Sequence, residues 1–266
     1  MISRLLVGTD GSDSAAQAVE RAVGLADGLR AQLTVTSVYL PPDPSAGGPF
    51  GPTEIYPARE IAQGVLRDVK RRYPADTVET ALEMGDPADT LCRMAEEQGT
   101  DLIVVGNRGM SGTRRFLLGS VPNKVTHHAP CSVLVVNTTG DAEPKAYGKI
   151  VVGTDGSETA GLALTMAAEI AAAAGASLLI IYAGDEARGK QILDQAAGAV
   201  GAVPIETRVA DDDPAEALVS IAQSEGAQAI VVGSKGMTGA ARFLLGSVPN
   251  KISHQAPCDV LIVRTS

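Results

Sequence analysis

The chain repeats itself, and this repeat limits the possible folds more than any other feature. Residues 4–15 read RLLVGTDGSDSA and residues 149–160 read KIVVGTDGSETA, at an offset of 145. Residues 102–139 and 229–266 are identical at 25 of 38 positions at an offset of 127, so the second copy is 18 residues shorter. The repeats of solenoid proteins span only about 20–50 residues, so this longer period indicates one domain per copy. We expect two domains, residues 1–140 and 147–266, joined by a short polar run.

The length difference falls on residues 40–57, a Pro- and Gly-rich segment that has no counterpart in the second copy. Pro and Gly interrupt helices and strands, so the segment is typical of a loop. We expect it to cover a site in the first copy only, which would make the two copies unequal.

Apolar runs rich in Val, Ile and Leu alternate with helical patterns in both copies. The strand-like runs are residues 4–9, 32–39, 77–83, 101–106 and 132–137, then 149–154, 177–182, 205–210, 228–233 and 259–264. In the first copy, helical patterns span residues 14–29, 58–73, 87–98 and 120–128. Nearly continuous apolar strands are typical of parallel sheets that are covered on both faces. We therefore predict an α/β fold of two tandem, doubly wound, five-stranded parallel sheets of Rossmann-like type, with ligands at the carboxyl ends of the strands.

Composition excludes several classes of function. The net charge is -9 and aromatic residues make up 3%, which disfavours both a basic face and a stacking platform for nucleic acid. Three cysteines without a CxxC pair predict neither a disulfide framework nor a zinc site. The longest weakly polar stretch, residues 170–183, is too short and too interrupted to span a bilayer. We expect a cytoplasmic protein that binds neither nucleic acid nor membranes.

A glycine pattern follows the fourth strand of each copy. Gly106 and Gly109 are separated by two residues, and nine residues then lead to Gly119 and Ser120; the second copy repeats this spacing with Gly233, Gly236, Gly246 and Ser247. Glycine lets a ligand approach the backbone, and a helix that begins at the serine offers unpaired amides to an anion. Basic residues lie in or beside the same loops, so the pattern favours a polyphosphate; they are Arg108, Arg114, Arg115 and Lys124, then Lys235, Arg242 and Lys251. The alternative is that the glycines are turn residues and the serine is only a helix cap.

This constellation resembles the ATP-binding signature of the universal stress protein family. VGTDGS near the start of each copy and APCxVLxV at residues 129–136 and 256–263 resemble the same family, so the chain is similar to a tandem two-domain member. The resemblance implies an adenine nucleotide alpha hydrolase-like fold that binds ATP, or AMP or ADP, together with Mg²⁺. The nucleotide-binding residues that it implies are Asp10, Val38, Gly106, Arg108, Gly109, Gly119, Ser120 and Val121, then Asp155, Ala183, Gly233, Lys235, Gly236, Gly246, Ser247 and Val248.

The resemblance also implies that the last strands of the two copies, residues 132–137 and 259–264, pair within the chain as a pseudo-dimer; a homodimer of two chains stays open. Asp10 and Asp155 have an alternative role as turn or capping residues. The sequence has no GxxxxGK[ST], GxGxxG or GxSxG pattern, and we assign no catalytic or metal-binding residue.

Three functions therefore remain. The first is a nucleotide-dependent stress or signalling module with two sites per chain. The second is a slow ATPase or phosphotransferase, and the third is an interaction scaffold without nucleotide.

Overall fold

The computed structural model of the chain describes residues 1–41, 55–74, 78–108, 118–138, 146–201, 203–234 and 245–264. Most of the segment at residues 40–57 lies outside this range, so its expected covering of a site is not part of the description. The middle of each glycine loop is also outside, together with Gly109, Lys235 and Gly236. We call residues 1–138 the first half and residues 146–264 the second half.

Strands and helices alternate along both halves. The first half contains β1 (Arg4–Gly8), α1 (Asp13–Leu29), β2 (Gln32–Tyr39), α2 (Ile55–Arg72), β3 (Val78–Met84), α3 (Pro87–Gln98), β4 (Leu102–Gly106), α4 (Ser120–His128) and β5 (Ser132–Val136). The second half contains β6 (Lys149–Gly153), α5 (Glu158–Ala174), β7 (Ser177–Ala183), α6 (Glu186–Ala199), β8 (Ile205–Ala210), α7 (Pro214–Ser224), β9 (Ala229–Gly233), α8 (Ser247–Gln255) and β10 (Asp259–Val263). The predicted alternating α/β fold is confirmed.

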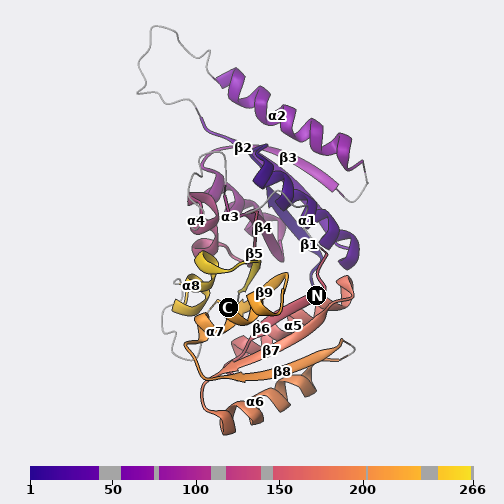
Figure 1. Ribbon diagram of the computed structural model, residues 1–266. Helices are drawn as coiled ribbons and strands as arrows, with labels where there is room; N and C mark the ends of the chain where they lie inside the picture. The colour runs from indigo at the N-terminus through magenta and orange to yellow at the C-terminus, as the bar shows by residue number, and fades with distance from the viewer. Residues whose placement is uncertain are drawn as a thin grey trace.

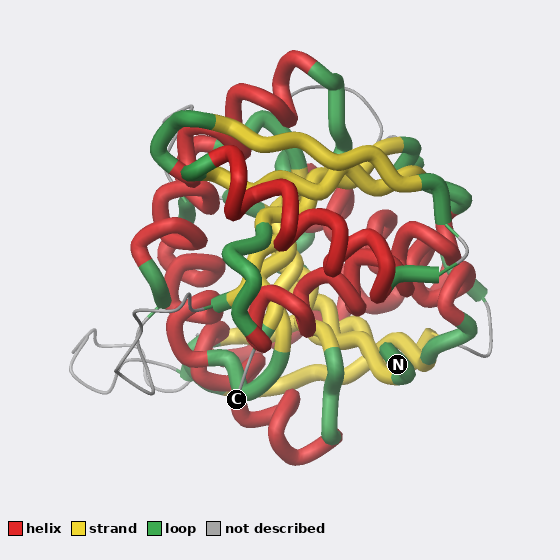
Figure 2. Tube along the Cα trace, turned by 90° about the horizontal axis from the view of Figure 1, so that it is seen from below, coloured by secondary structure: helices red, strands yellow, loops and turns green. Residues whose placement is uncertain are grey.

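All ten strands form one sheet, in the order β3-β2-β1-β4-β5-β10-β9-β6-β7-β8 (Figure 1). Neighbouring strands are parallel except at the centre, where β5 and β10 pair antiparallel, with Leu134 opposite Leu261. The strands β4, β5 and β10 are buried along most or all of their length. Because helices cover both faces, these strands carry apolar side chains in both directions, which explains their continuous Val/Ile/Leu sequences (Figure 2).

The two faces of the sheet are organised differently. On one face, side chains of α1, α2, α5 and α6 share a single hydrophobic core that runs through both halves. The helices α1 and α5 approach closely there, since a Cβ atom on Gly28 would lie 3.2 Å from the backbone oxygen of Ala173. On the other face, α3 and α4 form a core with the first half, and α7 and α8 form a separate core with the second half. The halves are thus joined by the sheet and by one helical layer.

Helix ends follow from local sequence. Asp86 caps α3 by accepting hydrogen bonds from the amides of Ala88 and Asp89, and Pro87 occupies the first turn. Gly99 ends the same helix in the left-handed conformation. Within the described ranges, none of the helices is long and apolar enough to cross a membrane.

Candidate functional site

The carboxyl edge of the sheet gathers the predicted site residues where the winding changes direction. In the first half, β1 and β4 are neighbours, and the chain leaves β1 toward α1 on one face and β4 toward α4 on the other. Asp10 follows β1, Gly106 ends β4, and Gly119 precedes α4. In the second half, β6 and β9 are neighbours in the same way, and Asp155, Gly233 and Gly246 occupy the matching places. In open parallel sheets, ligands bind in a crevice at this position.

The helices α4 and α8 begin without a side-chain cap. The N-cap residues are Gly119 and Gly246, which have no side chain, whereas Ser12, Asp86, Ser157, Asp185 and Asp213 cap the other helices whose N-caps are described. A capping side chain satisfies the amides of the first turn, so its absence leaves them available.

Two amides remain unpaired at the start of each of these helices. The amide of Gly119 donates to the carbonyl of Asn107 at 2.9 Å, and that of Gly246 donates to the carbonyl of Ser234 at 2.9 Å. The third residue of each helix is proline and has no amide. Within the described residues, this leaves the amides of Ser120 and Val121 in α4, and of Ser247 and Val248 in α8, without an acceptor. Both serines are exposed, so an anion can reach these donors.

Gly106 has a packing role. It is buried, and a Cβ atom there would lie 2.8 Å from Ser14 Oγ and 3.1 Å from the Ser14 carbonyl oxygen. The end of β4 therefore needs glycine in order to lie against the start of α1. Its contact with nucleotide stays a prediction.

Asp10 and Asp155 shape the turns that lead into α1 and α5. Asp10 Oδ1 accepts hydrogen bonds from the amide of Ser12 at 3.0 Å and from Ser12 Oγ at 2.6 Å, and Ser12 in turn caps α1. Asp155 and Ser157 repeat this arrangement in the second half. The turn role left open by the sequence is thus present, and the ligand role stays a prediction. Val38 and Ala183 lie near the ends of β2 and β7, on the strands next to β1 and β6.

Three polar residues that the sequence did not assign to the site connect the loops of the first half. Ser14 Oγ donates to the carbonyl of Arg108 at 2.9 Å and lies 2.7 Å from Thr138 Oγ1. Thr138 donates to Asn107 Oδ1 from its hydroxyl at 2.6 Å and from its amide at 3.2 Å. This network fixes the start of the glycine loop against α1 and the end of β5. In the second half, Ser234 replaces Asn107, so the longer amide side chain is absent.

The lysines of α4 and α8 are engaged in ion pairs. Lys124 Nζ lies 2.7 Å from Asp89 and 3.2 Å from Asp86, and its hydrogen bond to Asp89 raises its pKa. Lys251 pairs with Asp213 and Glu216 in the same way. The lysines that the sequence places with the basic loop residues are therefore held by carboxylates in the described structure. They join α3 to α4 and α7 to α8.

A sequence model of the universal stress protein family matches residues 1–137, 146–199 and 183–264. These matches span nearly the whole chain. The chain belongs to the universal stress protein family. The resemblance inferred from the glycine spacing and the repeated end motifs is confirmed.

Relatives in this family match the whole chain, most of it, or about half of it. A universal stress protein of Mycolicibacterium smegmatis is 30% identical over 287 residues, covering 98% of this chain and 96% of the relative. Universal stress protein Rv1636 of Mycobacterium tuberculosis is 41% identical over 141 residues, covering 51% of this chain and 96% of the relative. A crystal structure of a universal stress protein from Archaeoglobus fulgidus has a TM-score of 0.78 at 21% identity and covers 99% of this chain and 98% of its own. This last similarity concerns the fold alone.

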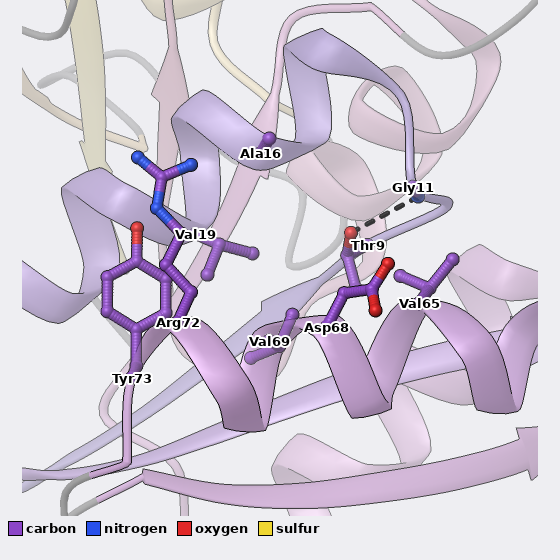
Figure 3. A pocket seen from close by; sticks show the side chains of 9 residues that line it. All are labelled: Thr9, Gly11, Ala16, Val19, Val65, Asp68, Val69, Arg72 and Tyr73. Atoms are coloured by element: carbon purple, nitrogen blue, oxygen red, sulfur yellow. Dashed lines mark hydrogen bonds between the residues drawn. The ribbon is translucent and has the colours of Figure 1, made fainter.

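A cavity of about 170 Å³ lies between α1 and α2, next to the β1–α1 turn (Figure 3). Its lining residues are Thr9, Gly11, Ala16, Val19, Val65, Asp68, Val69, Arg72 and Tyr73. The side chains of Arg72 and Tyr73 point from the end of α2 toward α1 (Figure 3), and the Tyr73 hydroxyl is buried without a hydrogen-bond partner among the described residues. No feature of the sequence predicts this cavity, because it depends on how two helices distant in sequence pack.

Histidine and cysteine have structural roles at the described positions. Burial raises the pKa of Cys131 and of Cys258 to about 12, so both thiols stay protonated at neutral pH. His127 and His128 end α4 and His254 lies in the last turn of α8, where the helix dipole favours a cation, but burial and the neighbouring His128 lower the pKa of His127. Among the described residues there is no cluster of His, Cys, Asp and Glu that could hold a metal ion.

Proposed function

We propose that each half of this universal stress protein binds one adenine nucleotide, with ATP as the ligand, and that the chain is a nucleotide-dependent signalling module. The observation that carries the proposal is the pair of unpaired amides at the start of α4 and again at the start of α8. These amides lie at the crevice where the sheet winding reverses, and a helix start favours phosphate there.

The number of donors limits how much of the affinity the described residues supply. A hydrogen bond to a charged oxygen contributes about 1.5–3 kcal/mol, so two amides contribute about 3–6 kcal/mol. A micromolar dissociation constant corresponds to about 8 kcal/mol. We infer that the rest comes from the base, through residues near Val38 and Ala183, and from the glycine loops around Gly109 and Gly236. We propose that Mg²⁺ binds together with ATP, carried on its phosphates.

A binding role is favoured over catalysis by the position of the acidic residues. Rapid phosphoryl transfer requires a group that orients the nucleophile. The acidic residue at the crevice is Asp10, and its Oδ1 atom is used to hold Ser12 in the turn. A carboxylate that fixes the backbone is poorly placed to orient a water molecule, so we propose at most weak ATP hydrolysis.

The test removes a single amide without disturbing the helix. Ser120→Pro deletes the amide of the first residue of α4, a position where proline is well tolerated, and Gly119 already has the extended backbone that precedes proline. Loss of one such bond should weaken ATP binding to the first half by about 10- to 100-fold. Isothermal titration of the purified chain with ATP, ADP, AMP and cAMP measures both affinity and stoichiometry.

Matched variants separate the amide from the hydroxyl. Ser120→Ala keeps the amide and should bind ATP as the unchanged chain does, while Ser247→Pro should affect only the second site. The unchanged chain should bind two equivalents of ATP. If it binds none, or if Ser120→Pro binds two equivalents with unchanged affinity, the proposed site is wrong.

We further propose that, through the antiparallel pairing of β5 with β10, the two halves of one chain form an intrachain pseudo-dimer. The two edge strands cover one another, so neither is left open for a second chain. Light scattering at increasing protein concentration measures the molar mass and tests this proposal. A stable dimer in which β5 or β10 of one chain pairs with a strand of a second chain would contradict it.

A further inference from the structure

The antiparallel pairing of β5 with β10, which we call the seam, has a symmetric arrangement of backbone atoms. Positions 133, 134 and 135 correspond to positions 260, 261 and 262 by the repeat, and the register pairs Val133 with Ile262 and Val135 with Val260. At one end the amide of Asn137 donates to Asp259 Oδ1 at 2.9 Å. At the other end the amide of Arg264, the counterpart of Asn137, donates to Ser132 Oγ at 3.1 Å. The backbone alone therefore does not distinguish one half from the other.

The side chains at the two ends of the seam differ. Asp259 is 3% exposed, and its Oδ2 atom accepts from Arg21 Nε at 2.8 Å and from the Tyr147 hydroxyl at 2.8 Å. The Arg21 guanidinium also lies 4.3 Å from the centre of the Tyr147 ring. Arg21 belongs to α1 of the first half, whereas Tyr147 and Asp259 belong to the second half. The ion pair thus crosses from one half to the other.

The repeat shows which residues stand at the other end. Ser132 corresponds to Asp259, Met166 corresponds to Arg21, and Ile2 corresponds to Tyr147. Ile2 is buried and Met166 is partly buried against the shared core. This end therefore has no charged side chain at the three matching positions. At the other end the contact between the halves that involves a charged side chain is a different one: Glu169 of α5 accepts a hydrogen bond from the amide of Ile2 at 2.6 Å.

This asymmetry determines which halves can pair. Two first halves paired through β5 would each place Arg21 opposite Ser132, with no carboxylate in reach. Two second halves paired through β10 would each place Asp259 opposite Met166, so its contact with Arg21 would be lost, and the partly exposed Arg264 would stand where Asn137 now lies. A buried charge that loses its partner is strongly unfavourable, while unlike halves neutralise one another. We propose that the ion pair between Arg21 and Asp259 makes each half pair preferentially with the unlike half. The β5–β10 pairing then forms within one chain, and pairing between like halves of two chains is disfavoured.

The energetics of the ion pair agree with a role in selection. Burial raises the pKa of Asp259, and Arg21 and the other donors offset this only in part. A buried ion pair of this kind contributes little net stability compared with apolar residues of the same size, but it makes a mismatch costly. The inference rests on the proposed self-pairing of the chain and is independent of nucleotide binding.

The experiment uses the full chain with a specific protease site placed within residues 139–145, which join the halves. The folded protein is cut, the two fragments are allowed to exchange in mild urea, and native mass spectrometry counts like and unlike pairs. For the unchanged residues we expect like pairs at no more than about one hundredth of unlike pairs. The double variant Arg21→Met with Asp259→Ser copies the opposite end of the seam, and it should move the pairs toward the random ratio.

Three outcomes would overturn the proposal. Abundant like pairs with the unchanged residues would show that the halves do not select. If the double variant forms only unlike pairs, residues other than Arg21 and Asp259 determine which halves pair. Fragments that do not associate at all would contradict the self-pairing itself, whereas a failure of the nucleotide proposal would appear only in the ATP titrations. As a second measurement, the uncut double variant should form dimers by exchanging halves, and the uncut unchanged chain should not.

Discussion

The two halves of the molecule share a backbone and several polar contacts, and they differ in the polar side chains around the start of the glycine loop. Both end β4 or β9 at a glycine, and both begin the following helix with a glycine cap and two unpaired amides. Around this common frame, Asn107 of the first half is replaced by Ser234 in the second, and Thr36 by Ile181. The part that remained the same after duplication is the arrangement of main-chain donors. This supports a ligand that is held by the backbone more than by particular side chains.

Among the described residues, the first half has packing features whose counterparts in the second half carry other side chains. It contains the cavity between α1 and α2 and two buried hydroxyls, of Thr36 and Tyr73, without partners among the described residues. The matching residues of the second half are larger or apolar: Leu164 for Val19, Ile192 for Val65 and Val200 for Tyr73. Replacing a residue of one half with its counterpart from the other half therefore tests which of these differences change the free energy of unfolding.

The largest expected effect comes from Arg21→Met, which gives α1 the residue that α5 has at the same place. Asp259 would then be buried without its cation, and we expect the free energy of unfolding to fall by about 3–5 kcal/mol at pH 7. Urea unfolding measures the change. As a control, Arg93→Met removes a half-exposed residue that pairs with Glu83 and Glu97, and it should cost less than about 1 kcal/mol.

The pH dependence of this variant has a definite sign. Burial raises the pKa of Asp259 above the ordinary value of 3.8, so the folded state holds this proton more tightly than the unfolded state. The contribution of Asp259 to the free energy of unfolding therefore falls as the pH rises from about 4 through the folded pKa. Without Arg21 that pKa rises further, so the destabilisation by Arg21→Met should be smaller at pH 4 than at pH 7. An equal loss at both values would contradict a buried, ionised Asp259.

Much of the fold followed from the sequence, because strands and caps are encoded locally. The bounds of β2, α3 and α4 coincide with those predicted, since α3 begins at Asp86-Pro87 and α4 at Gly119-Ser120. The start of α2 was placed at residue 58, and the helix begins at Ile55, because the preceding Pro- and Gly-rich segment obscures the helical pattern. The topology of the sheet then brings Asp10 and Gly106 to one edge, as predicted.

The connections between distant segments could not be predicted. Arg21 and Asp259 are 238 residues apart, and an aspartate at the start of a strand gives no sign of burial. Similarly, Lys124 was grouped with the basic loop residues because of its position in the sequence, yet α3 supplies its partners. Pairing of charges depends on which helices pack together, and hydrophobic periodicity does not specify this.

A smaller effect, of opposite sign, is expected for Thr36→Val. Thr36 is 0% exposed, and its hydroxyl has no hydrogen-bond partner among the described residues. Replacing it with an apolar side chain of the same shape removes the cost of burying that hydroxyl, so we expect a gain of about 1–2 kcal/mol in the free energy of unfolding. Thr34→Val, at a partly exposed position of the same strand, should change it little. If Thr36→Val destabilises the protein, its hydroxyl has a role that the second half lacks.

The smallest expected effect is from Val65→Ile, which adds one methylene to the cavity between α1 and α2. The second half shows that the larger side chain fits beside the same turn. Gly156, the counterpart of Gly11, lies against Ile192, and both glycines have positive φ and no Cβ atom to obstruct the helix. One buried methylene corresponds to about 0.8 kcal/mol, so we expect Val65→Ile to stabilise the chain by about 0.5–1 kcal/mol. The reverse change, Ile192→Val, should cost about 0.5–1.5 kcal/mol because it opens a cavity in the second half. Urea unfolding measures the free energy of unfolding of both single variants and of the double variant. If Val65→Ile destabilises the chain while Ile192→Val has the expected cost, the cavity between α1 and α2 does not accept a larger side chain. The smaller residue of the first half would then have a role of its own at this place.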